Sequence, residues 1–264
     1  MHRPTVSIIV TTYNSPQYLE LSVRSIFRQS ILPDEILIAD DGSGESTGKL
    51  VESLAGESEV PLRHIWQEDE GFRAGAIRNK AIAAASSEYI LQIDGDIILH
   101  PRFIEDHLSV ARRGTFVTGS RVLLSEELSR EIINDRRIDI SLKEKGVRHP
   151  FNGRRIPWLI PFFTGYKSSD GTYTRSCNLA CWREDLLKVN GYNEDISGWG
   201  REDSELSLRL INAGVKKRFL KFGGIQFHLH HKENSKDRDP RNIAIMENTA
   251  KQKLKWIPNG IVKK

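Results

Sequence analysis

Cysteine and long apolar stretches are scarce in this chain. Its 264 residues include only Cys177 and Cys181, so no second cysteine pair is present to complete a zinc site. This small number predicts reduced thiols in a cytoplasmic protein. No apolar run approaches the roughly 18 residues of a membrane span, and the run within residues 1–10 is too short for a signal peptide. We therefore expect a cytoplasmic protein, either soluble or lying on the inner face of the membrane.

A strong excess of one charge is also missing. The chain has 39 Lys and Arg against 35 Asp and Glu, a net charge of +4. Because it also lacks a basic stripe and an aromatic RNA-binding motif, nucleic acid is not an expected partner. There is no G-x-x-x-x-G-K-[ST] phosphate loop. The glycines of residues 42–48 have the wrong spacing for dinucleotide binding, and they follow the second predicted strand instead of the first.

Strand-like and helical patterns alternate in the first hundred residues. Strands are predicted at Val6–Thr12, 35–39, Leu62–Trp66 and 89–93, and helices at Pro16–Phe27, 47–55 and 74–85. This alternation favours βαβ units and a mainly parallel sheet, the α/β class, in one domain over residues 1–264. The second half is less regular, with predicted helices at 103–111, 125–145, 184–189, 202–213 and 243–255, a strand at 116–122 and loops at 146–175.

An acidic pair follows the strand predicted at 89–93. Asp94 and Asp96, separated by Gly95, lie where an α/β sheet binds its ligands, outside the carboxyl ends of the strands. Carboxylates on a short turn suit Mg²⁺ or Mn²⁺, which bind jointly to carboxylates and to substrate phosphates. The alternative is that the Asp-Gly pair is only a turn between two strands.

Other polar residues are predicted at the same edge. Thr11, Tyr13 and Asp41 follow the first two strands, where a tyrosine can stack on a base and an aspartate can accept hydrogen bonds from a nucleoside. Arg73 and Arg78 open the third helix, within reach of a diphosphate. Taken alone, each of these motifs favours a structural role instead: helix capping, turn formation or solvated arginines.

Two further motifs lie in the second half. Trp199, between two glycines, offers an aromatic plate for a sugar, and Glu202 and Asp203 beside it could supply a general base. Acidic residues in a first helical turn also serve as capping residues. His228 and His230 share a face if they lie in a strand, so either could complete a metal site begun by Asp96; otherwise they are a surface feature.

Together and in this order, the motifs resemble family 2 glycosyltransferases of the GT-A fold, an αβα sandwich. The resemblance extends from about residue 6 to about residue 231 and rests on the segments 11–14, 40–43, 71–79, 94–96 and 198–203 followed by a histidine. The segments at 71–79 and 198–203 look most like chondroitin-polymerase-type enzymes, and the latter also resembles the β-1,4-galactosyltransferases. Those relatives use UDP-sugars and a divalent metal, and they invert the anomeric carbon.

The resemblance implies a role for each candidate residue. Residues 1–100 would bind the nucleotide sugar, and residues 101–264 would bind the acceptor and carry the catalytic base. The donor would be held by Thr11, Tyr13, Asp41, Asp94 and either Arg73 or Arg78. The metal, Mn²⁺ or Mg²⁺, would be ligated by Asp96 with His228 as first choice and His230 as second. The acceptor side would comprise Trp199 as a platform, Glu202 holding hydroxyls and Asp203 as general base.

The implied activity is metal-dependent, inverting transfer of one sugar. The donor would be a UDP-hexose or UDP-N-acetylhexosamine, and the acceptor a hydroxyl of a glycan or lipid-linked glycan. The membrane helices and Gln-x-x-Arg-Trp motif of processive synthases are missing, and Glu45 replaces a frequent aspartate. One alternative is a degenerate sugar-nucleotide-binding protein. Another is a nucleotidyltransferase, which would need a glycine- and lysine-bearing loop that residues 11–17 do not provide.

Residues 156–163 form an unusually apolar stretch flanked by Arg154, Arg155 and Lys167. Such a stretch could lie over a lipid-linked acceptor or contact an anionic membrane. General burial preferences favour the other interpretation, in which it packs against the sheet as core.

Overall fold

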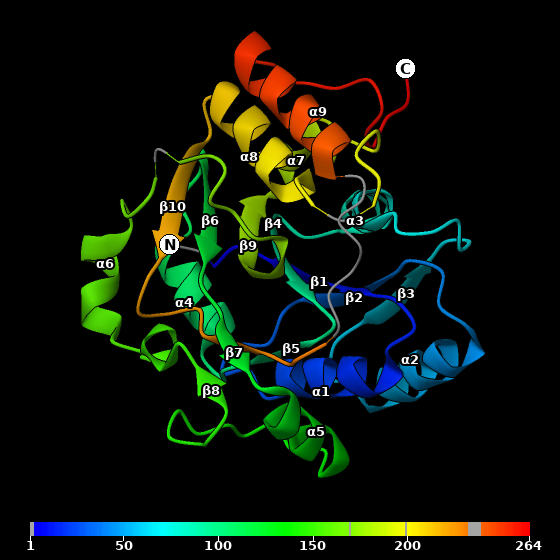
Figure 1. Ribbon diagram of the computed structural model, residues 1–264, viewed down its shortest axis with the longest axis vertical. Helices are drawn as coiled ribbons and strands as arrows, with labels where there is room; N and C mark the ends of the chain where they lie inside the picture. The colour runs from blue at the N-terminus through cyan, green and yellow to red at the C-terminus, as the bar shows by residue number, and fades with distance from the viewer. Residues whose placement is uncertain (1–2, 169, 199, 232–238) are drawn as a thin grey trace.

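A seven-stranded sheet forms the centre of the molecule (Figure 1). The computed structural model describes residues 3–168, 170–198, 200–231 and 239–264. The strand order is β10 (Lys216–Leu220), β6 (Thr115–Gly119), β9 (Leu179–Trp182), β4 (Tyr89–Asp94), β1 (Val6–Thr12), β2 (Glu35–Asp40) and β3 (Leu62–Trp66). β9 is antiparallel to β4 and β6, and the other neighbouring pairs are parallel. The mainly parallel α/β sheet expected from the sequence is thereby confirmed.

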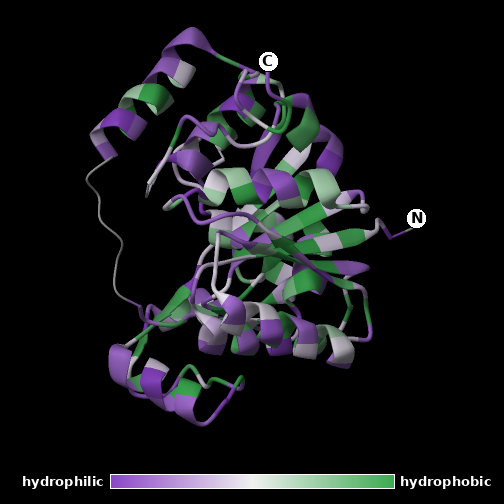
Figure 2. Ribbon diagram, turned by 90° about the vertical axis from the view of Figure 1, so that its right-hand side faces the viewer, coloured by the Kyte–Doolittle hydropathy of each residue, from purple (hydrophilic) through white to green (hydrophobic). Residues whose placement is uncertain are grey.

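Helices cover both faces of this sheet because the central strands are apolar on both sides. One face packs against α1 (Pro16–Phe27), α2 (Glu45–Glu57) and α4 (Phe103–Val110), and the other against α3 (Ala74–Ala84), α7 (Arg183–Lys188) and α8 (Glu202–Asn212). α9 (Asp239–Gln252) packs on the outside of α8. Figure 2 shows the hydrophobic strands between helices whose outer faces are polar. No helix in the described ranges has the length and apolarity required to cross a membrane.

A smaller sheet positions the histidine segment. It has the order β5 (Ile97–Leu99), β11 (Gln226–His228), β7 (Val122–Leu124) and β8 (Val147–Arg148), and α5 (Glu126–Asn134) packs beside it. Ile98, Val122 and Phe227 form its apolar core. Because β5 directly follows the Asp94–Asp96 turn and pairs with β11, the small sheet carries His228 to the acidic pair.

Two of the predicted elements were wrong. The single strand expected at 116–122 is divided between β6 and β7, which belong to different sheets. The helix expected at 125–145 ends at Asn134, and Arg136 takes a positive φ of 48° just beyond it. After Asn134 the chain continues as a loop. Its apolar side chains pack on the small sheet, and its charged side chains face solvent, which accounts for the charged pattern of the segment.

The apolar stretch at 156–163 is not core, which corrects the interpretation favoured by burial preferences. It forms η2 (Pro157–Leu159) and α6 (Ile160–Phe163), which lie outside the edge strand β10 (Figure 1). Trp158 is 71% exposed and Phe162 is 79% exposed, whereas Ile160, at 3%, reaches the main core. Helices this short cover the sheet edge with one side only, so their remaining apolar side chains face solvent.

Candidate active site

The predicted residues of the first two strands and the acidic turn meet at one edge of the sheet. Thr11 is paired with Asp94 in the register of β1 and β4. The amide of Gly95 donates a hydrogen bond of 2.7 Å to the carbonyl of Thr11, and a Cβ at Gly95 would lie 3.1 Å from that oxygen. Glycine therefore allows the acidic turn to fold tightly over the end of β1.

Asp96, His228 and His231 form a cluster able to hold a metal ion. One potential ligand atom from each side chain lies within 4.8 Å of the other two. Nε2 of His231 is 2.9 Å from Oδ2 of Asp96, and Nε2 of His228 is 3.6 Å from the same oxygen. The other carboxylate oxygen of Asp96, Oδ1, is buried and has no hydrogen-bond partner in the structure. A buried carboxylate oxygen without a partner, beside two imidazoles, fits a divalent metal ion.

The protonation states of this cluster suit metal binding. Burial would raise the pKa of Asp96, but the hydrogen bond from His231 and the nearby His228 and Arg121 outweigh burial and lower it. Burial lowers the pKa of His228 to about 4, against the opposing effect of Asp96. At neutral pH, Asp96 is therefore a carboxylate and His228 a neutral imidazole, the forms that ligate a cation.

His231, which the sequence analysis did not select, occupies the position considered for His230. β11 ends at His228, so the strand alternation that placed His228 and His230 on one face does not extend to His230. The side chain of His230 lies outside the cluster. The backbone of His230 is held by Ser129 Oγ at 2.8 Å and by the hydroxyl of Tyr18 at 3.1 Å.

Arg78 connects the acidic turn to the start of α8. Its guanidinium donates to Oδ1 of Asp94 at 3.0 Å, to Oε1 of Glu202 at 3.1 Å and to Oγ1 of Thr11 at 3.1 Å. The ring of Tyr192 lies 5.5 Å from the guanidinium carbon. Burial would lower the pKa of Arg78, but the charges of Asp94 and Glu202 keep it raised. Arg78 is thus a buried, permanent cation that fixes two of the predicted site carboxylates.

Asp203 lies beside this bridge with its carboxylate held from two sides. Its Oδ1 accepts from the amide of Ser204 at 2.7 Å, and its Oδ2 accepts from the amide of Ser176 at 3.3 Å. Burial, followed by the charge of Glu202, raises the pKa of Asp203 to about 7. A carboxyl group with this pKa is suited to proton exchange at neutral pH. Trp199, the predicted acceptor platform, lies outside the described residues.

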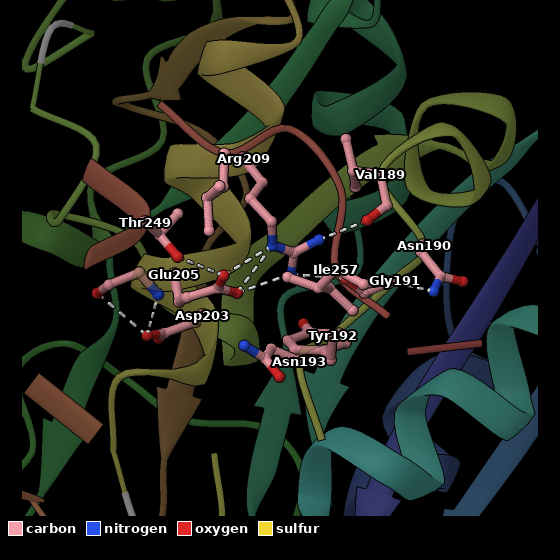
Figure 3. Close-up of polar contacts among 12 residues, drawn as sticks. Val189, Asn190, Gly191, Tyr192, Asn193, Asp203, Glu205, Arg209, Thr249 and Ile257 are labelled. Carbon is pink, nitrogen blue, oxygen red and sulfur yellow. Dashed lines mark hydrogen bonds and ion pairs between the residues drawn. The ribbon is translucent and has the colours of Figure 1, made fainter. Parts of the chain in front are cut away.

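A buried ion pair anchors the helix that presents Glu202 and Asp203 (Figure 3). Arg209 and Glu205, one turn apart on α8, are both 0% exposed and 2.7 Å apart. Arg209 also donates to the carbonyls of Val189 and Gly191 at 2.6 and 2.7 Å. Glu205 accepts from the hydroxyl of Thr249 on α9 at 2.9 Å. These bonds tie α8 to the loop before Tyr192 and to α9, so the network sets the position of the first turn of α8.

At the other end of the edge, Asp41 is held by the segment before α3. Its oxygens accept from Nε2 of Gln67 at 2.5 Å and from the amide of Arg73 at 2.7 Å. The guanidinium of Arg73 contacts the Glu68 carbonyl and the Glu70 carboxylate. Burial raises the pKa of Asp41 despite those hydrogen bonds.

Two exposed aromatic rings lie near Asp41. Tyr13 is 47% exposed and donates to Asp69 at 2.9 Å. Trp66, which sequence reasoning missed, is 51% exposed at the carboxyl end of β3, and its indole donates to the carbonyl of Ser43. The signal in the sequence was that Trp66 ends a predicted strand; in the sheet, two strands separate it from β4 and the acidic turn.

Comparisons with known proteins agree with this arrangement. The family model described as glycosyl transferase family 2 matches residues 7–169, and the model described as the N-terminal domain of galactosyltransferase matches residues 163–232. Validoxylamine A glucosyltransferase of Streptomyces hygroscopicus subsp. limoneus is 25% identical over 81% of this chain and 49% of its own length. Chondroitin synthase of Escherichia coli is 25% identical over 91% of this chain and 37% of its own length. The chain therefore spans half or less of these relatives.

Solved structures resemble the fold over nearly the whole chain. The mannosyltransferase PcManGT from Pyrobaculum calidifontis, in complex with GDP-Man and Mn²⁺, aligns with a TM-score of 0.66 at 18% identity, covering 96% of this chain and 65% of that one. TarS 1–349 of S. aureus aligns with a TM-score of 0.64 at 18% identity, covering 94% and 65%. The same TarS fragment in complex with UDP aligns at 0.60 with 16% identity, covering 92% and 64%. The fold is thus the GT-A fold.

Proposed function

Because the chain belongs to glycosyl transferase family 2, we propose that it transfers one sugar from a nucleotide-diphosphate donor to a hydroxyl of a glycan or lipid-linked glycan. The observation that carries the proposal is the meeting of Asp94, Glu202 and Asp203 around Arg78, beside the Asp96 cluster. UDP-hexoses and UDP-N-acetylhexosamines are the proposed donors. The UDP and GDP-Man complexes of TarS and PcManGT support a nucleotide-sugar donor.

In the proposed reaction, an acceptor hydroxyl attacks the anomeric carbon as the bond to the diphosphate oxygen breaks. The hydroxyl proton passes to Asp203, and a single displacement of this kind inverts the anomeric carbon. Arg78 holds Asp94 and Glu202 in place to bind sugar or ribose hydroxyls. Thr11, Tyr13, Asp41 and Arg73 are proposed to hold the nucleotide.

Asp96, His228 and His231 are proposed to hold the divalent cation. When bound, Mn²⁺ or Mg²⁺ neutralises the charge that develops on the leaving diphosphate. The Mn²⁺ in the PcManGT complex supports this choice of ion. Cys177 and Cys181 are both buried free thiols, which supports the proposed cytoplasmic location.

The test of this function is thermal stability with UDP, GDP, CDP or dTDP, each with and without Mn²⁺. A nucleotide at 100 times its dissociation constant stabilises the folded chain by about 2.7 kcal/mol, which is readily detected. We expect a Mn²⁺-dependent rise with UDP, and loss of that rise in Asp96→Asn. No rise with any of the four nucleotides would contradict the proposal.

Replacement of His231 by alanine is expected to weaken Mn²⁺ binding in the presence of UDP. The loss should be at least the roughly 10–100-fold that removal of an outer-shell partner of a metal ligand costs. Electron paramagnetic resonance of free Mn²⁺ in a titration measures this affinity directly. His230→Ala is the matched control, since His230 lies outside the cluster. Equal losses in the two variants would remove His231 from the proposed ligand set.

A further inference from the structure

A basic cavity lies on the side of the molecule occupied by α6. It has a volume of about 210 Å³ and is bounded by α4, β10 and the η2–α6 segment. Its charged lining residues are Glu105, Asp106, Arg112, Arg155 and Arg218. Arg155 is neutralised there, since Asp106 and Glu105 lie 2.7 and 3.3 Å from its guanidinium. This leaves the charges of Arg112 and Arg218 to be accounted for.

Arg112 and Arg218 have no acidic partner among the residues that the structure describes. Nε of Arg218 is buried without a hydrogen-bond partner. Burial and the positive charge of Arg112 both lower the pKa of Arg218, and the carboxylates that share the cavity, Glu105 and Asp106, are paired with Arg155. Guanidinium groups match the geometry of phosphate oxygens. A bound phosphate would accept a hydrogen bond from Arg218 and would reduce the repulsion between Arg112 and Arg218.

Exposed aromatic side chains lie in a segment that lines this cavity. Pro157, Ile160 and Pro161 line it, and the same short segment carries Trp158 and Phe162, the most exposed of the large apolar side chains described. Aromatic rings of this kind are favoured at the headgroup level of membranes, where one side is apolar and the other is wet.

The surrounding chain is strongly basic. Residues 147–175 contain five Lys and Arg against one acid, and residues 216–221 contain four Lys and Arg and no acid. Lys221 lies 5.3 Å from the ring centres of both Phe151 and Tyr166, so the charges are interleaved with the exposed rings. An anionic bilayer complements both properties at once, whereas a neutral partner would leave the charges unmatched.

We propose that this face is a docking surface for an anionic phospholipid membrane. Trp158 and Phe162 enter the headgroup layer, and a lipid phosphate lies between Arg112 and Arg218 in the cavity. The surface is defined by η2, α6 and the four residues just named.

This surface is continuous with the acceptor side of the active site. The ring of Phe219 in β10 contacts two tyrosine rings. Its centre lies 5.2 Å from that of Tyr166 and 5.8 Å from that of Tyr173. The carbonyl of Thr172 accepts a hydrogen bond from Ser204, the neighbour of Asp203. Docking would therefore bring Asp203 near a lipid-borne acceptor, a consequence that rests on the proposed function, whereas membrane binding itself does not.

The proposal is tested by sedimenting the protein with phosphatidylcholine vesicles that contain or lack 30% phosphatidylglycerol. We expect binding to the anionic vesicles, weakened by added salt as screening shortens the range of the charges. Arg112→Gln with Arg218→Gln should reduce the partition coefficient roughly 25-fold, since each basic residue near an anionic surface contributes about fivefold. Trp158→Ala with Phe162→Ala should also lose most of the binding.

The control is Lys49→Gln with Lys80→Gln, which removes two exposed charges from α2 and α3 and should bind as the unaltered protein does. UDP-induced stabilisation, if present, is expected in all variants, so failed docking and failed nucleotide binding are distinguishable. Equal binding by the arginine variant and the control would overturn the proposal. A second result would also overturn it: self-association without lipid that rises with protein concentration and is abolished by Trp158→Ala with Phe162→Ala. A second copy of the chain would then be the partner that covers this face.

Discussion

Replacing Asp203 by asparagine is expected to lower kcat by roughly 10²–10⁴-fold, the usual contribution of a positioned general base. The amide cannot take the acceptor proton, and its single oxygen can keep only one of the two hydrogen bonds that Ser176 and Ser204 donate. Donor binding should be retained, because in the part of the chain that the structure describes none of the residues proposed to hold the nucleotide is hydrogen-bonded to Asp203. Turnover with a labelled sugar nucleotide and nucleotide affinity measured in parallel separate the two effects.

Asp185→Asn is the matched control for this substitution. Asp185 also lies in the first turn of a helix, and burial raises its pKa as well, but it belongs to α7 and contacts none of the proposed site residues in the described structure. It should leave kcat near that of the unaltered chain. Near-normal turnover in Asp203→Asn would remove Asp203 as the base.

The pH profile of kcat gives an independent check. Asp203 must be ionised to accept a proton, so the rate should rise with pH and level off above about 7, the pKa that burial and Glu202 impose on Asp203. The folded chain keeps a proton on Asp203 between the ordinary pKa of 3.8 and about 7, where the unfolded chain has lost it. The stability contributed by this group is therefore lost as pH rises through that window. Asp203→Asn should consequently lack this fall in stability between about pH 4 and pH 7, as urea unfolding at several pH values can establish.

Replacing Arg209 by methionine is expected to destabilise the fold by about 3–5 kcal/mol, the usual cost of removing one partner of a buried ion pair. Glu205 would remain buried without its cation, and the carbonyls of Val189 and Gly191 would lose their donor. Urea unfolding followed by circular dichroism measures the change. Lys49→Met breaks an exposed pair with Glu45 of the same i,i+4 spacing and should cost less than about 0.5 kcal/mol.

A double substitution shows whether the charge pair itself matters. Arg209→Met combined with Glu205→Leu removes both charges and should recover part of the lost stability, because no uncompensated charge remains buried. If the network positions the first turn of α8, the recovered variant should fold but turn over more slowly than the unaltered chain. A loss confined to the single variant, with full activity in the double, would show that the pair contributes stability alone.

The sheet and its edge residues could be predicted because they depend on local patterns. The apolar runs of β1, β2 and β4 and the polar residues after them are consecutive in sequence, so their meeting at one edge follows from parallel pairing. Short strands such as β5, β9 and β11 offer no comparable run, and neighbours distant in sequence define them.

The histidine cluster could not be predicted fully for the same reason: the end of a short strand is set by neighbours that are distant in sequence. The hypothesis that His228 and His230 share a face assumed that the strand continues, whereas pairing with β5 and β7 stops at His228. The chain then turns, which brings His231 to Asp96. Where a strand ends depends on the length of its partners, and this length cannot be seen in the residues around the histidines. The role of each residue in the ligand set remains a prediction.

The exposure of Trp158 and Phe162 was hidden from sequence reasoning for another reason. The composition of residues 156–163 shows that the stretch is apolar. Whether its side chains are buried depends on how much apolar surface is available beside β10, which the sequence of the stretch does not show. Within 156–163, Ile160 is the residue that becomes buried in the main core.

The reversed direction of β9 has a consequence for how such an enzyme can change its substrate. Because Leu179, the first residue of β9, pairs with Gln92 near the end of β4, it is the start of β9 that lies at the active-site edge. The segment leading into it, η3 (Ser176–Asn178), delivers the amide of Ser176 to Asp203. Residues between α6 and η3 take no part in the described strand pairings, although the carbonyl of Thr164 accepts a hydrogen bond from the amide of Phe219 in β10. Under the proposed function, changes in this stretch would alter acceptor preference while the strand pairings of the sheet are preserved.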